Sequence, residues 1–191
     1  MNSKSIIALI SIFTIQFLSS CVPCKCGDAV TYEVEYDGIT VVPWDTAGFG
    51  LAEVTDSVYR NAFGLTLSVN FEPRKVSQIQ SNFGFSGAYA CDCVGDQFNF
   101  IDPIANVEIF MTDVSNDEQQ DVTNLFGVYG YSGELISLAE LFANREQWHD
   151  GFQFELVEFD EIPTSVVFTV NVHLESGKVF SELTQQINFY N

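Results

Sequence analysis

The five cysteines are the residues of this chain with the most evident chemistry. A cysteine thiolate can act as a nucleophile, close a disulfide or bind a metal ion. Cys21 directly follows Leu18-Ser19-Ser20 and lies outside the two Cys-x-Cys pairs that the remaining cysteines form. Those remaining cysteines are Cys24, Cys26, Cys91 and Cys93. Cys21 and the two pairs therefore require separate explanations.

The segment before Cys21 has the organisation of an export signal. A basic start at Lys4 is followed by an apolar run over residues 6–18 and by two small residues. The sequence Leu-Ser-Ser-Cys resembles a bacterial lipobox, which predicts cleavage before Cys21 and attachment of lipid to its thiol. A transmembrane helix is one alternative, but a span needs about 20 apolar residues and this run is shorter. An ordinary signal peptide with a coincidental cysteine is the other, but small residues directly before a cysteine fit a lipobox better.

The four other cysteines are expected to form two disulfides, because an even number of cysteines in an exported protein is typical of such bonds. A bond within one Cys-x-Cys unit would close a very small, strained ring. Each of Cys24 and Cys26 is therefore expected to pair with one of Cys91 and Cys93, in either order. A four-thiolate zinc site is the alternative, and the oxidising compartment argues against it. We expect no metal and no cofactor.

Oxygen-bearing side chains at alternate positions suggest a calcium loop after residue 112. They are Asp113, Ser115, Asp117, Gln119 and Asp121. The sixth position is Glu118 instead of glycine and the twelfth is Asn124 instead of glutamate, so the pattern departs from a calcium-binding loop. A solvated loop between two strands is the favoured interpretation.

No motif of a hydrolase, zinc protease or nucleotide-binding enzyme occurs in the chain. His149 lies in a loop-like stretch, and His173 is expected on the wet face of a strand. Glu158, Asp160 and Glu161 could supply the paired carboxylates of a glycosidase, although neighbouring acids are common in a chain with 26 of them. We therefore expect no catalytic residues and no enzymatic activity.

Exposed aromatic residues on loops are weak candidates for ligand binding, since their rings could stack on sugars or pack against a partner. Trp44, Trp148 and the tyrosines at 129 and 131 fall in loop-like stretches. The alternative is that these rings close the ends of the folded domain.

The composition limits the partners that the chain can have. A formal net charge of −19 repels phosphate backbones, so binding to nucleic acid is not expected. It also repels anionic lipids, so the lipid on Cys21 would have to hold the protein at the membrane. We expect residues 1–20 to be a lipoprotein signal peptide, residues 21–30 a tether and residues 31–191 a single domain.

Alternation of apolar and polar residues predicts several short strands. They cover residues 32–36, 39–42, 65–71, 107–112, 152–156, 166–174 and 179–189. Pro43 is expected to end the second of them. Asp37-Gly38 predicts a hairpin turn, and Ser137-Leu138-Ala139-Glu140 is a capping box for one short helix ending near Asn144. The predicted fold is an all-β, immunoglobulin-like antiparallel sandwich with one short helix, and a lipocalin-like barrel is the alternative.

Several segments resemble uncharacterised lipoproteins of the Bacteroidetes type. They are Ala88-Tyr89-Ala90-Cys91, residues 107–112, Leu-x-x-Leu-Phe at residues 138–142, Val167-Phe168-Thr169-Val170, Gly177-Lys178-Val179-Phe180 and Thr184-Gln185-Gln186-Ile187. The resemblance covers most of the domain, and Cys93 departs from the pattern. It implies an anchored, exported, β-rich domain and no catalytic residue.

Taken together, these features predict a lipid-anchored cell-envelope protein that binds or assembles with a partner and performs no catalysis. Because no acidic run follows Cys21, we expect it at the outer membrane. The alternative is a surface lipoprotein that binds or processes glycans through Trp44 or Trp148.

Replacing Cys21 tests the anchor directly. We expect Cys21→Ser to leave the precursor uncleaved or to release the protein from membranes, because serine offers no thiol for the lipid. Fractionation of cells and the intact mass of the protein measure both effects. Processed Cys21→Ser protein that stays in the membrane fraction would contradict the lipobox interpretation.

Overall fold

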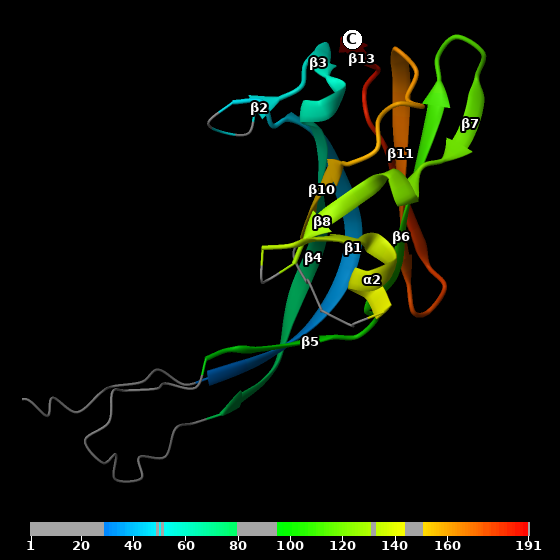
Figure 1. Ribbon diagram of the computed structural model, residues 1–191. Coiled ribbons are helices and arrows are strands. Elements are labelled where there is room, and N and C mark those ends of the chain that lie inside the picture. Colours follow the sequence, from blue (N-terminus) through cyan, green and yellow to red (C-terminus); the bar gives the residue numbers. More distant parts are fainter. Residues whose placement is uncertain are drawn as a thin grey trace, which may run out of the picture. The chain divides into compact units, whose positions relative to one another are not determined.

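A computed structural model describes residues 29–48, 50, 52–79, 95–130, 133–143 and 151–190 (Figure 1). The chain divides into two compact units, which we describe separately. The first comprises Met1–Glu33 with Pro73–Asn99, and the second Val34–Glu72 with Phe100–Asn191. In the described residues, no helix has the length and apolar character needed to cross a membrane.

The first sheet contains seven strands in the order β2-β1-β4-β10-β8-β9, with β5 also paired to β1. Its strands are β1 (Ala29–Asp45), β2 (Ala52–Glu53), β4 (Phe63–Ile79), β5 (Gln97–Phe100), β8 (Phe126–Tyr129), β9 (Leu135–Ser137) and β10 (Gly151–Leu156). The pairs β10–β4, β10–β8 and β8–β9 are antiparallel.

The second sheet contains six strands in the order β3-β13-β11-β6-β7, with β12 also paired to β11. Its strands are β3 (Ser57–Tyr59), β6 (Ile104–Asp113), β7 (Glu118–Asp121), β11 (Ser165–Leu174), β12 (Val179–Leu183) and β13 (Ile187–Tyr190). Figure 1 shows β11 running beside β6, with the β6–β7 hairpin at one end. The pair β13–β3 is parallel, and the other described pairs of this sheet are antiparallel.

The first unit is held by contacts between the ends of its strands. The Tyr32 and Phe98 rings stack with centroids 5.2 Å apart, and Asp96 Oδ1 accepts a hydrogen bond of 2.9 Å from the Val30 N–H. Arg74 Nη2 lies 2.5 Å from the Glu33 carboxylate. Because the Arg74 side chain is 77% exposed, this ion pair contributes little to stability.

Four phenylalanines join the two sheets of the second unit. Phe63 and Phe126 come from the first sheet, and Phe168 and Phe189 come from the second. The Phe63 ring stacks on Phe168 at 5.2 Å and meets Phe189 edge-on at 5.1 Å. All four are at most 5% exposed, and burying each ring contributes about 1.5–3 kcal/mol before entropy is counted. The predicted all-β sandwich is confirmed, whereas the barrel alternative does not describe these two open sheets.

The sequence periodicity placed the central strands and the helix correctly. On β11 the residues at even positions from Val166 to Leu174 are buried, as their shared face predicted. The helix α2 (Leu138–Ala143) begins where expected, with the Glu140 N–H donating to Ser137 Oγ at 3.2 Å. Its described residues end at Ala143, which agrees with the predicted end near Asn144. Two 3-10 turns, η1 (Arg60–Ala62) and η2 (Thr123–Leu125), complete the described elements.

The predicted hairpin turn at Asp37-Gly38 is wrong, because β1 passes through both residues without interruption. Neither residue has a positive φ, which the predicted turn would require. The buried positions instead change from even to odd numbers between Tyr36 and Ile39. One extra residue inserted into a strand produces such a shift, so Asp37-Gly38 is accommodated as an irregularity within the strand.

The predicted single strand over residues 179–189 is also interrupted. Leu183 pairs with Thr169 of β11, but Ile187 pairs with Val166, which leaves one residue more on the returning chain than on β11. Thr184 occupies this junction and is 7% exposed. Its N–H donates to the Phe168 carbonyl at 2.9 Å, and its hydroxyl accepts from the Phe168 N–H at 3.0 Å. The Thr184 side chain therefore replaces a backbone acceptor where β12 ends.

Replacing Thr184 with valine keeps the shape of the side chain and removes the acceptor for the buried Phe168 N–H. We expect Thr184→Val to lower the free energy of unfolding by about 1–3 kcal/mol, the cost of an unsatisfied buried donor. Urea unfolding followed by fluorescence measures this change. Thr169→Val on the half-exposed face of β11 is the matched control and should change the value by less than about 0.5 kcal/mol. Equal effects of the two substitutions would contradict the role of the Thr184 hydroxyl.

Candidate functional site

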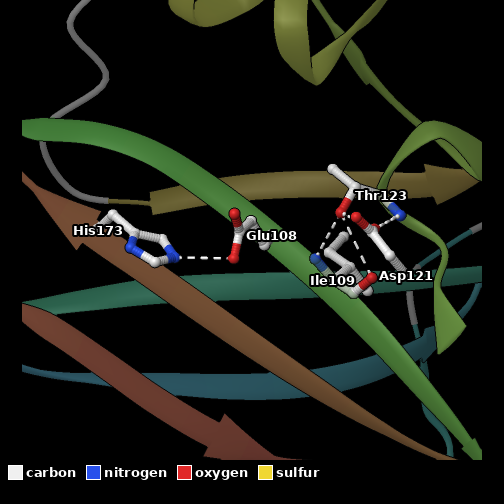
Figure 2. Close-up of polar contacts among 5 residues, drawn as sticks. All are labelled: Glu108, Ile109, Asp121, Thr123 and His173. Atoms are coloured by element: carbon white, nitrogen blue, oxygen red, sulfur yellow. Dashed lines mark hydrogen bonds and ion pairs between the residues drawn. The ribbon is translucent and has the colours of Figure 1, made fainter. Parts of the chain in front are cut away.

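The outer face of the second sheet carries the histidine that the structure describes. His173 Nε2 lies 2.9 Å from Glu108 Oε2, and the two residues are diagonal neighbours on β11 and β6 (Figure 2). Their side chains are 33% and 36% exposed, so the predicted wet-face position of His173 is confirmed. A half-exposed polar contact between neighbouring strands stabilises their pairing modestly. The His173–Glu108 pair is a contact between β11 and β6.

Thr123 and Asp121 form a second polar group on the same sheet. Thr123 Oγ1 accepts a hydrogen bond from the Ile109 N–H at 2.8 Å and donates to Asp121 Oδ1 at 2.6 Å (Figure 2). The same carboxylate oxygen accepts from the Thr123 N–H at 2.9 Å. These bonds fix the turn between β7 and η2.

Ser115 and Asp117 lie in the turn between β6 and β7, as the interstrand-loop interpretation predicted. Asp113, Gln119 and Asp121 lie instead in the two strands. Asp113 Oδ1 accepts from the Ser115 N–H at 2.8 Å, and Asn116 Oδ1 accepts from the Glu118 N–H at 2.9 Å. Asp117 takes a left-handed conformation at φ 57°. The polar residues therefore serve the turn itself, and no group of three potential metal ligands is found in the part of the chain that the structure describes.

The expected position of Trp44 is wrong. It was expected in an exposed loop, but it is the penultimate residue of β1, where it pairs with Glu53 of β2. The residue is half-buried, and its indole Nε1 is buried with no hydrogen-bond partner among the described residues. The alternating pattern of β1 continues through Pro43, so the strand extends beyond the proline that was expected to end it. Trp44 therefore does not present its ring on a loop.

The other candidates from the sequence lie largely outside the described residues. This holds for Cys21, Cys24, Cys26, Cys91 and Cys93, and also for Trp148, His149 and Tyr131. Tyr129 is described and is 48% exposed, with its hydroxyl 3.3 Å from Glu155 Oε2.

Two neighbouring hollows lie in the second unit where the loop between β10 and β11 passes. The larger, of about 530 Å³, contains all three acids that suggested a glycosidase: Glu158, Asp160 and Glu161. The smaller, of about 390 Å³, shares Phe159 and Asp160 with the larger one. It is also lined by Tyr59, Arg60, Asn61 and Tyr190. We refer to this smaller hollow as the tyrosine hollow.

Strand pairing places the two tyrosines of this hollow side by side. β3 and β13 run parallel, with Tyr59 opposite Tyr190 and Val58 opposite Phe189. Val58 and Phe189 are buried, so the tyrosines next to them must point away from the core. Their ring centroids are 5.4 Å apart with an angle of 51° between the planes. The Ser57 hydroxyl donates to Tyr190 Oη at 2.5 Å and fixes that ring.

Arg60 follows Tyr59 directly and opens the 3-10 turn η1. Its Nε is buried and has no hydrogen-bond partner among the described residues, and no ion pair joins it to another of them. Asp160 lines the same hollow on the opposite segment of chain. The hollow therefore combines aromatic faces with one cation and one carboxylate that do not neutralise each other directly.

Sequence reasoning identified Asp160 for a different role and missed Tyr59, Arg60 and Tyr190. Ser57 and Tyr190 are 133 positions apart in the chain, and only the parallel pairing of β3 with β13 brings them together. The available sequence signal was the buried-exposed alternation at Val58-Tyr59 and Phe189-Tyr190, which marks two outward tyrosines but not their proximity.

Comparisons with known proteins found no matching family model, no matching curated protein and no matching solved structure.

The Tyr129–Glu155 contact gives a measurable pH effect. The negative charge of Glu155, with some burial and the hydrogen bond, raises the pKa of Tyr129 above its ordinary value of about 10. The folded state holds the phenol proton of Tyr129 more tightly than the unfolded state does. Protonated Tyr129 therefore stabilises the fold below about pH 10, and this stabilisation is lost as the pH rises through the raised pKa. We expect Glu155→Gln to move the pKa back towards about 10. NMR titration of ring-labelled tyrosine measures the pKa, and Tyr129→Phe identifies the Tyr129 signal. An unchanged pKa in Glu155→Gln would show that Glu155 does not cause the shift.

Proposed function

We propose that the chain is an exported, lipid-anchored protein of the cell envelope, located at the outer membrane, that acts as a non-catalytic binding or assembly module. It uses the tyrosine hollow to hold a partner or ligand close to the membrane. The lipid on Cys21 supplies the anchor, and the β-sandwich supplies a rigid support for the hollow.

The anchor is supported by the residues that precede Cys21. The basic start, the apolar run and Leu18-Ser19-Ser20-Cys21 together favour export and lipidation. A lipoprotein carrying two or more acyl chains stays firmly attached, whereas one chain gives only reversible binding. The net charge of −19 gives the protein no electrostatic attraction to anionic lipid, so the acyl chains carry this role alone.

The binding role is carried by one observation, the combination of Arg60 with two exposed tyrosines. Tyr59 and Tyr190 are 54% and 53% exposed on neighbouring strands. Large rings and arginine are the side chains that most often dominate binding surfaces. An arginine without a partner among the described residues retains its donors for a ligand.

Glycan processing is the second candidate, and the position of the acids favours binding over processing. A glycosidase places two carboxylates on opposite sides of the scissile bond. Glu158, Asp160 and Glu161 lie within one short loop between β10 and β11. They therefore approach a ligand from one segment of chain, which supports recognition of a glycan without hydrolysis.

Photocrosslinking in intact cells tests the proposal. A diazirine amino acid at Asn61, an exposed position in the hollow, should give a discrete adduct with the native partner, whether protein or glycan. The same group at Glu118, exposed on the β6–β7 hairpin, is the matched control and should give none. The adduct at Asn61 should be lost in Cys21→Ser because the protein then leaves the membrane. Identical adduct patterns at Asn61 and Glu118, or none at Asn61, would contradict a binding role for the hollow.

A further inference from the structure

We propose that the tyrosine hollow is a saccharide-binding site that takes a neutral sugar. This inference rests on the proposed function as a binding module and identifies the chemical class of its ligand. It follows from the aromatic surface, the charge balance and the size of the hollow.

The two tyrosines supply the apolar part of such a site. A pyranose ring has an apolar face of C–H groups, which packs on an aromatic ring, and hydroxyls around its edge. Tyr59 and Tyr190 turn their rings away from the core, and the angle of 51° between them leaves them inclined to each other instead of stacked face to face. The bond from Ser57 to Tyr190 orders one ring before binding, which lowers the entropy cost of association.

The polar residues match the hydroxyls of a sugar. A hydroxyl both donates and accepts, so one side chain that only donates and another that only accepts can each bind it. Arg60 is such a donor and Asp160 such an acceptor, while the amide of Asn61 can do both. Hydrogen bonds to charged groups are stronger than those between neutral groups. Arg60 and Asp160 can therefore orient a neutral polyhydroxyl ligand without direct contact with each other.

The charges around the hollow disfavour an anionic ligand most strongly. An anion would gain from Arg60 but would meet Asp160 within the hollow and Glu158 and Glu161 in the adjoining one. The net charge of −19 adds long-range repulsion. A cation would be attracted by the acids but repelled by Arg60 inside the hollow. A neutral ligand meets no such repulsion from either charge.

The dimensions agree with more than one sugar unit. The tyrosine hollow has a volume of about 390 Å³, which lies within the range of small-molecule sites. Phe159 and Asp160 continue from it into the adjoining hollow of about 530 Å³. An oligosaccharide could therefore place one unit on the tyrosines and extend along Phe159.

Binding to a defined set of sugars tests the inference. The purified, lipidated full-length chain in detergent would be applied to an array of neutral hexaoses of glucan, mannan, xylan and galactan, together with uronic acid oligosaccharides. We expect binding to at least one neutral series and none to the uronic acids. Calorimetric titration with the strongest neutral hexaose then gives the affinity.

Substitutions connect binding to the named residues. Tyr190→Ala and Arg60→Gln should each weaken binding about tenfold, since a ring contact or a charge-assisted bond contributes about 1.5 kcal/mol. Asp160→Asn should weaken binding as well. Because asparagine keeps the shape of the aspartate side chain, this variant serves as the test if Tyr190→Ala fails to fold. Tyr129→Ala, at a tyrosine of similar exposure on β8, and Glu118→Gln are the matched controls and should leave the affinity unchanged.

The outcomes separate this inference from the proposed function. If no neutral hexaose binds more tightly than about 1 mM while the crosslink at Asn61 persists, the saccharide assignment is wrong and the binding module stands. If the crosslink at Asn61 is also missing, both are wrong. Neutral sugar binding that Arg60→Gln and Asp160→Asn leave unchanged would overturn the assignment to this hollow.

Discussion

The hydrogen bonds between Thr184 and Phe168 determine the course of the last strand and thereby the position of the tyrosine hollow. One edge of β11 pairs with two strands, β12 and β13, whose registers differ by one residue. Thr184 keeps the energetic cost of this change small. Its hydroxyl accepts the hydrogen bond of the Phe168 N–H, which the change in register leaves without a backbone acceptor. β13 can then pair with β3 on its other edge, and that pairing brings the two tyrosines together.

The hydrophobic core fixes the direction in which the tyrosines point. Val58 and Phe189 precede Tyr59 and Tyr190, and side chains alternate along a strand. Phe189 meets Phe63 edge-on within the aromatic cluster that joins the sheets. Rotating either strand to bury its tyrosine would expose its core residue and lose about 1.5–3 kcal/mol of burial. The outward tyrosines are therefore a consequence of the core, and their exposure does not require a separate local stabilisation.

Local patterns in the sequence predicted the parts of the fold that depend on local physics. The alternation of residues 166–174 and the capping box at Ser137 gave β11 and α2 nearly to the residue. The turn predicted at Asp37-Gly38 was wrong, because a strand whose flanking residues pair within a sheet can accommodate a dipeptide that usually forms a turn. The hollow could not be predicted, since it depends on a parallel pair between segments 133 residues apart and on a one-residue change of register. Periodicity within a segment contains neither piece of information.

The overall charge makes the state of Arg60 informative. The chain has 26 acidic residues and 7 basic ones, so carboxylates are abundant and an arginine can readily find one. Arg60 nevertheless makes no ion pair with a described residue, even though Asp160 lines the same hollow. Asp160 forms no direct ion pair with Arg60, and the loss is small because partly exposed ion pairs contribute little to stability. A ligand that bridges them replaces water with directed hydrogen bonds on a surface that the core already holds in place. The separation of Arg60 from Asp160 is thus what allows the hollow to recognise a neutral ligand.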